Sequence, residues 1–185
     1  MSDAAVIDHP SVPLVRQAFP DCAMQATLFR GQTTLIVPAA KVHAILRFLR
    51  DAPECGYNAL MDLSGIDYLG YPATQPGRFA VVYQLAALGS GNRLFVKVYL
   101  DPSLDTSGIV EDPTLYLDSV TRLWPAAEWA EREVFDMFGI RFKGHPDLRR
   151  ILMWRDYPAH PLRKDYPLTG RGEREHYSVT PRSQG

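Results

Sequence analysis

Residues 131–152 read EREVFDMFGIRFKGHPDLRRIL and combine the end of a helix, a turn and a charged connector. Pro125 suits the first position of a helix and Gly139 suits the left-handed residue that ends one, so we predict a helix over 125–138. Its apolar residues recur at helical spacing and are expected to form a buried face. They are Ala127, Ala130, Val134, Met137 and Phe138.

The polar residues of this helix allow two interpretations. Glu128, Arg132 and Asp136 follow one another at intervals of four, which favours ion pairs on an exposed face. Glu133 and Asp136 lie one turn apart and could instead be paired carboxylates or metal ligands. A dinuclear carboxylate site needs Glu-x-x-His on two helices, which this sequence lacks, so we interpret the pair as a solvated or salt-bridged face.

The connector after the helix contains two histidines that precede prolines, His145 and His160. They are separated by 15 residues and match no zinc-ligand spacing, so we assign them turn or interface roles. The polar residues between them lead into the apolar run 151–154, Ile-Leu-Met-Trp.

Upstream of this segment the sequence predicts helices and strands that suit one core. Apolar periodicity indicates helices over 11–19 and 38–51, and a hairpin whose strands cover 26–30 and 33–37. The clearest strands are 78–87 and 93–100, joined through a glycine-rich turn as an antiparallel pair. We therefore predict an α+β domain over 1–140, with two layers, a mixed β-sheet and helices on one face.

Residues 141–185 are predicted to form an extended, basic and proline-rich docking arm, called the C-terminal arm below. Residues 1–140 carry a net charge of −6 and residues 141–185 carry +5, so the overall charge of −1 hides a segregation. A basic arm on an acidic body suggests an acidic binding surface. Ordering each backbone residue costs about 1–2 kcal/mol, so we expect anchoring by the apolar run 151–154 and order further out only against another protein.

Several function classes lack sequence support. No apolar run approaches the roughly 18 residues of a membrane span, so we expect any membrane association to be indirect. Cys22 and Cys55 are the only cysteines, too few for the thiolates of an iron–sulfur cluster. No glycine-rich phosphate loop or nucleophile elbow is present. The basic arm with its tyrosines could bind nucleic acid, but acidic residues interrupt it and no such motif occurs, so this stays a minor alternative.

Three runs of sequence carry a family resemblance. They are EREVFDMFGIRFKGHPDLRRIL with HPLRKDYPLTG at 160–170, DLSGIDY at 62–68, and VTRLWPAA at 120–127. Together they make residues 60–170 similar to the C subunit of the proton-translocating NADH:quinone oxidoreductase, respiratory complex I. Because the chain ends soon after Gly170, we expect the unfused bacterial form rather than the form in which the C and D subunits share one polypeptide.

The resemblance implies a non-catalytic structural subunit of the peripheral arm of that complex. It implies no cofactor in this chain, while the complex uses FMN, Fe–S clusters and quinone to pass electrons from NADH, coupled to proton translocation. It also implies the D and B subunits as partners, a location on the cytoplasmic side of the bacterial inner membrane, and no nucleic acid. An equivalent subunit of a membrane-bound hydrogenase, or of another donor:quinone oxidoreductase, is the alternative.

We expect the residues that match the family motifs to form a polar hub at a subunit interface, called the predicted hub below. We also expect Arg149→Ala to lower assembly of the complex without altering any redox centre. No catalytic, cofactor-binding or metal-binding residue is assigned. The predicted hub consists of Glu131, Arg132, Glu133, Asp136, His145, Pro146, Asp147, Arg149, Arg150, Arg163, Lys164, Asp165 and Tyr166.

Overall fold

A computed structural model describes residues 7–173, so the outer ends of both predicted segments, 1–6 and 174–185, lie outside the described residues. Its centre is a five-stranded sheet in the order β1-β2-β5-β4-β3. β2 and β5 are parallel and the other neighbours are antiparallel, which confirms the predicted mixed sheet. The strands are β1 (Gln25–Phe29), β2 (Gln32–Ile36), β3 (Ala59–Asp67), β4 (Phe79–Ala87) and β5 (Asn92–Leu100).

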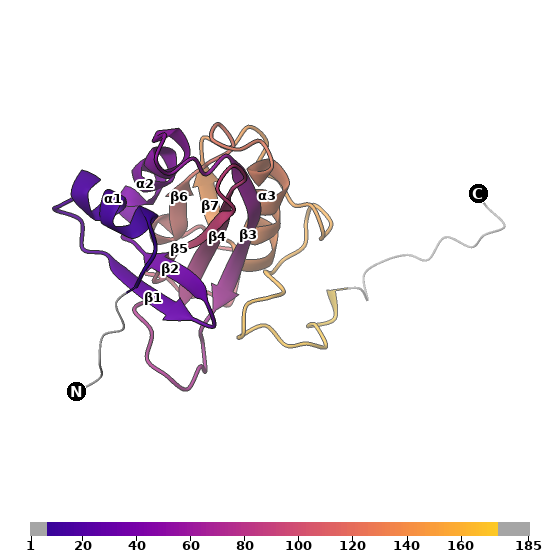
Figure 1. Ribbon diagram of the computed structural model, residues 1–185. Coiled ribbons are helices and arrows are strands. Elements are labelled where there is room, and N and C mark those ends of the chain that lie inside the picture. Colours follow the sequence, from indigo (N-terminus) through magenta and orange to yellow (C-terminus); the bar gives the residue numbers. More distant parts are fainter. Residues whose placement is uncertain (1–6, 174–185) are drawn as a thin grey trace.

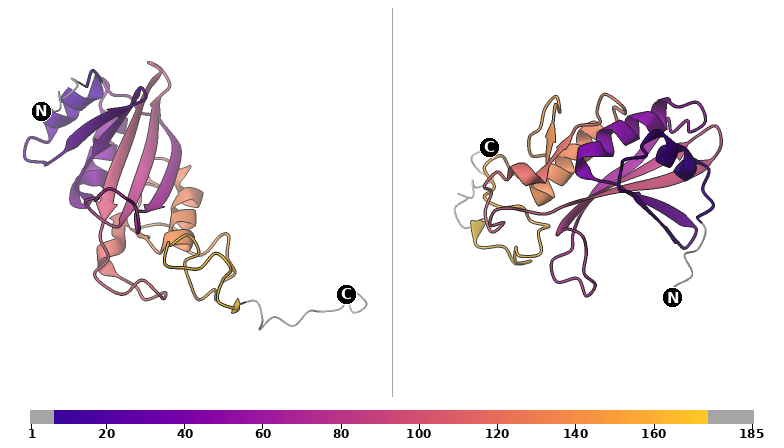
Figure 2. Two further views of the ribbon diagram at one scale, coloured as in Figure 1. Left: turned by 90° about the horizontal axis from the view of Figure 1, so that it is seen from below. Right: turned by 90° about the vertical axis from the view of Figure 1, so that its left-hand side faces the viewer.

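The helices α1 (Ser11–Ala18), α2 (Ala39–Asp51) and α3 (Ala127–Phe138) complete the α+β fold, and Figures 1 and 2 show α2 and α3 on the same face of the sheet. The apolar stripe of α2 is buried as its periodicity predicts. From β5, alternate residues are buried in the same core, whereas those between them are more exposed. This confirms two layers with helices on one face.

Besides β3, three elements add to the predicted set. A 3-10 turn, η1 (Pro113–Leu115), leads into β6 (Tyr116–Asp118), and β6 pairs in parallel with β7 (Arg141–Lys143). β7 directly follows α3 and therefore ties the first residues of the C-terminal arm to the body. The boundary at residue 140 stays a prediction.

Helix α3 begins at Ala127, after the predicted start at Pro125, because the chain first makes a tighter turn. The backbone N–H groups of Ala127 and Glu128 donate to carbonyl groups three residues back, at 3.0 and 3.1 Å. The predicted end is confirmed, since Gly139 has φ +76° in the left-handed region. Against β3, the ring of Phe138 occupies the space that a Cβ on Gly65 would need, so this glycine lets helix and strand approach closely.

Candidate functional site

The C-terminal arm is attached to the body at two sites built from charged side chains. We call the first the α3 anchor, formed by Arg132, Asp136, Arg150 and His160. We call the second the sheet anchor, formed by Asp67, Arg78, Thr106 and Asp165. Figure 1 shows the arm leaving β7 and passing beside α3.

The α3 anchor is centred on Asp136, whose side chain is 0% exposed. Its Oδ2 accepts hydrogen bonds from the backbone N–H groups of three successive residues, at 2.8 to 3.0 Å. Those residues are Ile151, Leu152 and Met153. Burial alone would raise the pKa of Asp136, but these N–H groups and Arg150 hold it below its ordinary value. The side chain is therefore a buried anion, and the predicted exposed ion-paired face is wrong at this position.

Arg150 makes the opposite half of this contact. Its Nη1 donates to Asp136 Oδ1 at 2.6 Å, and its Nη2 donates to the carbonyl groups of Tyr157 and Ala159 at 2.8 and 2.9 Å. The guanidinium thus joins α3 to two points further along the arm. A charged group shared among several backbone acceptors fixes geometry more strongly than a single neutral hydrogen bond.

Two further side chains complete the α3 anchor. Arg132 donates to the carbonyl groups of residues 149 and 150, both at 3.1 Å. His160 Nδ1 lies 2.9 Å from the carbonyl oxygen of Asp136. Burial lowers the pKa of His160 to about 4, so the imidazole is neutral at pH 7 and its Nδ1 donates to this carbonyl.

Arg163 closes the end of α3. Its Nε donates to the carbonyl of Phe138 at 2.7 Å, and its Nη1 donates to the carbonyl groups of Thr106 and Gly108 at 2.8 and 3.1 Å. Burial lowers its pKa to about 10, so it stays charged at pH 7. A Cβ on Gly139 would collide with this guanidinium and with His160. The glycine therefore serves both the helix end and the close approach of the arm.

The sheet anchor lies where β3 ends and β4 begins. Arg78 binds Asp67 through two hydrogen bonds, at 3.1 and 2.9 Å, and also pairs with Asp165 at 2.9 Å. The backbone N–H of Lys164 donates to Asp67 at 2.8 Å. Burial would raise the pKa of Asp67, but the Arg78 guanidinium and this N–H lower it. Arg78 and Asp67 therefore form a bidentate ion pair, although neither belongs to the predicted hub.

Glu131 is buried beneath the connector. Its Oε1 accepts the backbone N–H of Val120 at 2.7 Å, while its Oε2 has no hydrogen-bond partner among the described residues. His145 lies nearby, with Nε2 4.0 Å from Oε2 and 2.9 Å from the carbonyl oxygen of Glu128. Burial raises the pKa of Glu131 to about 7. It also raises the pKa of Tyr83, whose buried hydroxyl likewise has no partner in the described part of the chain.

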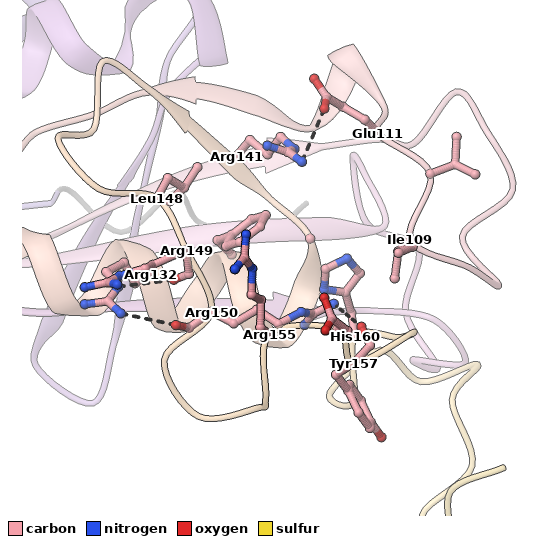
Figure 3. Close-up of a pocket in the computed structure, with 14 residues that line it drawn as sticks. Ile109, Glu111, Arg132, Arg141, Leu148, Arg149, Arg150, Arg155, Tyr157 and His160 are labelled. Atoms are coloured by element: carbon pink, nitrogen blue, oxygen red, sulfur yellow. Dashed lines mark hydrogen bonds and ion pairs between the residues drawn. The ribbon is translucent and has the colours of Figure 1, made fainter. Parts of the chain in front are cut away.

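A groove of about 950 Å³ runs beside the α3 anchor, and Figure 3 shows its lining side chains. Arg132 and Phe135 of α3, Arg141 of β7 and several arm residues line it. Arg132, Arg149 and Arg150 are the predicted hub residues in its lining.

The structure brings together part of the predicted hub and leaves part of it outside. Glu131, Arg132, Asp136, His145, Arg150, Arg163 and Asp165 make the contacts described above. Tyr166 contacts Tyr157 and Glu173 through its hydroxyl, at 2.5 and 2.6 Å. Glu133, Pro146 and the side chains of Asp147, Arg149 and Lys164 lie in solvent, and Asp147 pairs with Arg149 at 2.8 Å.

The prediction that the apolar run 151–154 anchors the arm by burial of its side chains is wrong. Leu152 is 62% exposed, and none of the four residues is fully buried. Residues 151–153 are held by their backbone N–H groups on Asp136, and Met153 also packs, partly buried, against the core. Arg78 and Thr106 were missed altogether, because no local spacing connects them to residue 165.

Among residues 7–173 no group of three or more His, Cys, Asp or Glu side chains is placed to hold a metal ion. Both cysteines are free thiols. None of the described helices combines the length and apolar character that crossing a bilayer requires.

Comparison with known proteins identifies the family. The model of the respiratory-chain NADH dehydrogenase 30 kDa subunit matches residues 35–172. The chain belongs to this family. A Citrifermentans bemidjiense relative, described as the C subunit of NADH-quinone oxidoreductase, is 42% identical over 170 residues, covering 92% of this chain and 95% of the relative. The protein of the same description from a Roseiflexus species is 44% identical over 154 residues, covering 83% and 80%.

Solved structures agree with this membership. A trypsin-resistant fragment of Nqo5 superposes with a TM-score of 0.58 at 34% identity, covering 74% of this chain and 96% of the fragment. A chain of an archaeal membrane-bound sulfane sulfur reductase superposes with a TM-score of 0.65 and covers 91% of each chain. At 22% identity the second match shows a shared fold alone.

Proposed function

We propose that this chain is the C subunit of a proton-translocating NADH:quinone oxidoreductase, in which it stabilises the peripheral arm without catalysing a step itself. The observation that carries the proposal is the identity of 42% over 92% of the chain to a protein described as the C subunit of NADH-quinone oxidoreductase. Electrons pass from NADH through FMN and Fe–S clusters to quinone in other subunits. The match to a chain of a sulfane sulfur reductase shows a shared fold alone. It therefore gives weaker support to the alternative, an equivalent subunit of an oxidoreductase with another electron donor.

The way the charged side chains are used supports a structural role. Asp136 and Arg150 hold backbone groups of the arm, whereas Arg163 donates from the arm to a backbone carbonyl of α3. His160 is a buried neutral imidazole. An active site needs titratable groups that converge on space for a substrate. Asp136, Arg150, His160 and Arg163 converge on the protein's own backbone instead.

The partners follow from the same proposal. The D and B subunits, with other members of the peripheral arm, would contact the C-terminal arm and the surface around it, on the cytoplasmic side of the inner membrane. The net charge of the C-terminal arm, +5 against −6 for residues 1–140, supports these contacts. A basic segment favours an acidic surface on a partner. FMN, Fe–S clusters and quinone are assigned to those other subunits.

Purification from membranes tests the proposal. An affinity-tagged chain is expected to recover an assembly that contains FMN and Fe–S clusters and oxidises NADH with quinone. Arg150→Ala should lower recovery of the assembly, and Arg93→Ala, which removes an exposed arginine from β5, should not. Recovery of the chain with no other subunit, or turnover of a substrate by the chain alone, would refute the proposal. Nucleic-acid binding that weakens steeply with salt would favour the minor alternative instead.

A further inference from the structure

The groove beside the α3 anchor combines a large volume with walls from separate parts of the chain. Its volume of about 950 Å³ is near the upper end of the roughly 300–1,000 Å³ of ligand clefts. The walls come from residues 109–111, from α3, from β7 and from arm residues 148–160. A space shared by these segments suits an extended ligand better than a compact one.

The groove carries an excess of positive charge. Five arginines line it, and three of them have a carboxylate partner: Arg141 with Glu111 at 3.2 Å, Arg149 with Asp147 at 2.8 Å and Arg150 with Asp136 at 2.6 Å. Asp156 is the one other acidic residue in its lining.

The remaining two arginines, Arg132 and Arg155, have no carboxylate partner among residues 7–173 and are available to bind a ligand. Arg132 donates only to carbonyl oxygens and stacks near the ring of Trp129, 5.9 Å from its centroid. Arg155 makes no hydrogen bond or ion pair with another residue in the range 7–173, and its side chain is exposed. In the view of Figure 3, Arg155 lies between Arg132 and Arg141. Arginine in such a setting favours bidentate binding of a carboxylate.

Apolar side chains lie beside these charges. Ile109 and Val110 are 53% and 67% exposed, and they line the groove together with the partly buried Phe135 and Leu148. Exposed aliphatic groups next to unpaired arginines are typical of protein interfaces, where arginine and aromatic residues are enriched. A small inorganic anion would leave these apolar walls uncovered.

We propose that this groove binds an acidic, extended segment of a neighbouring subunit. A carboxylate of that segment pairs with Arg155 and Arg132, and an apolar side chain packs on Ile109 and Val110. This inference rests on the proposed function, because it places the chain in a multi-subunit assembly, and it adds the surface and the chemistry of one partner.

Site-specific photo-crosslinking in the assembled complex tests the inference. Val110 is replaced by p-benzoylphenylalanine, and Leu88, 68% exposed on the β4–β5 turn, is replaced in a control. We expect the Val110 probe to form an adduct with an acidic segment of another subunit, mapped by mass spectrometry, and the Leu88 probe not to reach that segment. An adduct with lipid or with a non-acidic segment, or no adduct in an assembled complex, overturns the inference.

Charge reversal gives the second readout. Arg155→Glu should reduce the Val110 adduct about tenfold, because like charges across an interface oppose binding, whereas Arg93→Glu should not change it. Arg155 makes no contact that holds the fold, so the variant should remain folded. Equal adduct yields in the two variants overturn the inference while the proposed function stands. Recovery of the unsubstituted chain outside any assembly overturns both.

Discussion

The sheet and the C-terminal arm are stabilised by different interactions within one chain. Strand β4 is buried along almost its whole length, and its neighbours are held by apolar packing and ladder hydrogen bonds. The described part of the arm, residues 141–173, has no strand beyond β7 and no helix. It is fixed by a few charged side chains that bind its backbone.

This difference predicts how each region responds to substitution. Apolar packing is distributed, so the loss of one side chain weakens the whole core in proportion to the atoms removed. The arm depends on single groups such as Asp136, which holds three backbone N–H groups at once. Removing one such group should therefore release a segment while the sheet stays folded.

The largest expected effect is that of Asp136→Ala. It leaves Arg150 and three N–H groups without their buried partner, and breaking a buried charged pair costs about 3–5 kcal/mol. We expect rapid tryptic cleavage within residues 149–163 while hydrogen exchange in β4 stays slow. Leu46→Ala in α2 is the matched core variant, since it should lower global stability without selective cleavage of the arm. Equal cleavage rates in the two variants would show that the arm and core unfold as one unit.

The next effect separates backbone strain from crowding. Gly139→Ala and Gly144→Ala both place alanine at positive φ, +76° and +78°. That conformation costs about 1–3 kcal/mol for a non-glycine residue. Only at Gly139 does the new Cβ also collide with Arg163 and His160. Denaturant unfolding should therefore show a clearly larger loss for Gly139→Ala, and similar losses would argue against close packing at the helix end.

A smaller effect concerns the pH dependence of stability. The pKa of Glu131 is about 7 in the folded chain against an ordinary value of 4.5. Its contribution to the free energy of unfolding is therefore complete below pH 4.5 and is lost as pH rises through 7. His160 titrates near 4 against an ordinary 6.5, so its contribution is complete above pH 6.5 and is lost as pH falls towards 4. The two trends oppose each other between pH 4.5 and 6.5.

Glu131→Gln separates these trends. The variant keeps the size of the side chain but removes its titration, so only the loss on acidification remains. We expect its denaturation midpoint to fall more steeply than that of the unsubstituted protein between pH 6.5 and 4.5, and to be higher than that of the unsubstituted protein at pH 8. Parallel pH profiles for the two proteins would contradict a raised pKa at Glu131.

The smallest effect on the fold is expected for Arg149→Ala. Its side chain is 73% exposed and pairs only with Asp147, and such surface pairs contribute about 0–1 kcal/mol. Thermal unfolding of the isolated chain should change little. The prediction that this substitution lowers assembly stands, because Arg149 lines the groove. Reduced assembly with an unchanged Tm would locate its role at an interface, whereas normal assembly would contradict that prediction.

The fold could be predicted where periodicity is strong. The hairpin of β1 and β2 follows from Gly31, the α2 stripe from its helical spacing, and the β4–β5 pair from two apolar runs with a glycine-rich turn. Strand β3 was not predicted, because Gly65 and Asp67 weaken its pattern. β6 and β7 have three residues each, too few for any period to be visible.

The candidate site was only partly predictable, for a related reason. Local sequence shows that Arg132, Asp136 and Arg150 are polar and near one another in the chain, but not which of them is buried. Asp136 looked like an exposed helical residue because its partners are backbone N–H groups 15 to 17 positions away, which have no side-chain pattern. The sheet anchor depends on Arg78 and Asp165, which only the folded sheet brings together.

The hydrogen bond from Lys164 to Asp67 spans 97 positions of the chain and has a consequence for biogenesis. During translation the strand that bears Asp67 emerges long before residue 164, so this part of the arm can dock only after residue 164 has been made. The groove needs arm residues up to His160, so it also forms late. A partner that binds the groove would therefore select chains that extend past residue 160 and ignore shorter nascent ones, which sets an order for assembly.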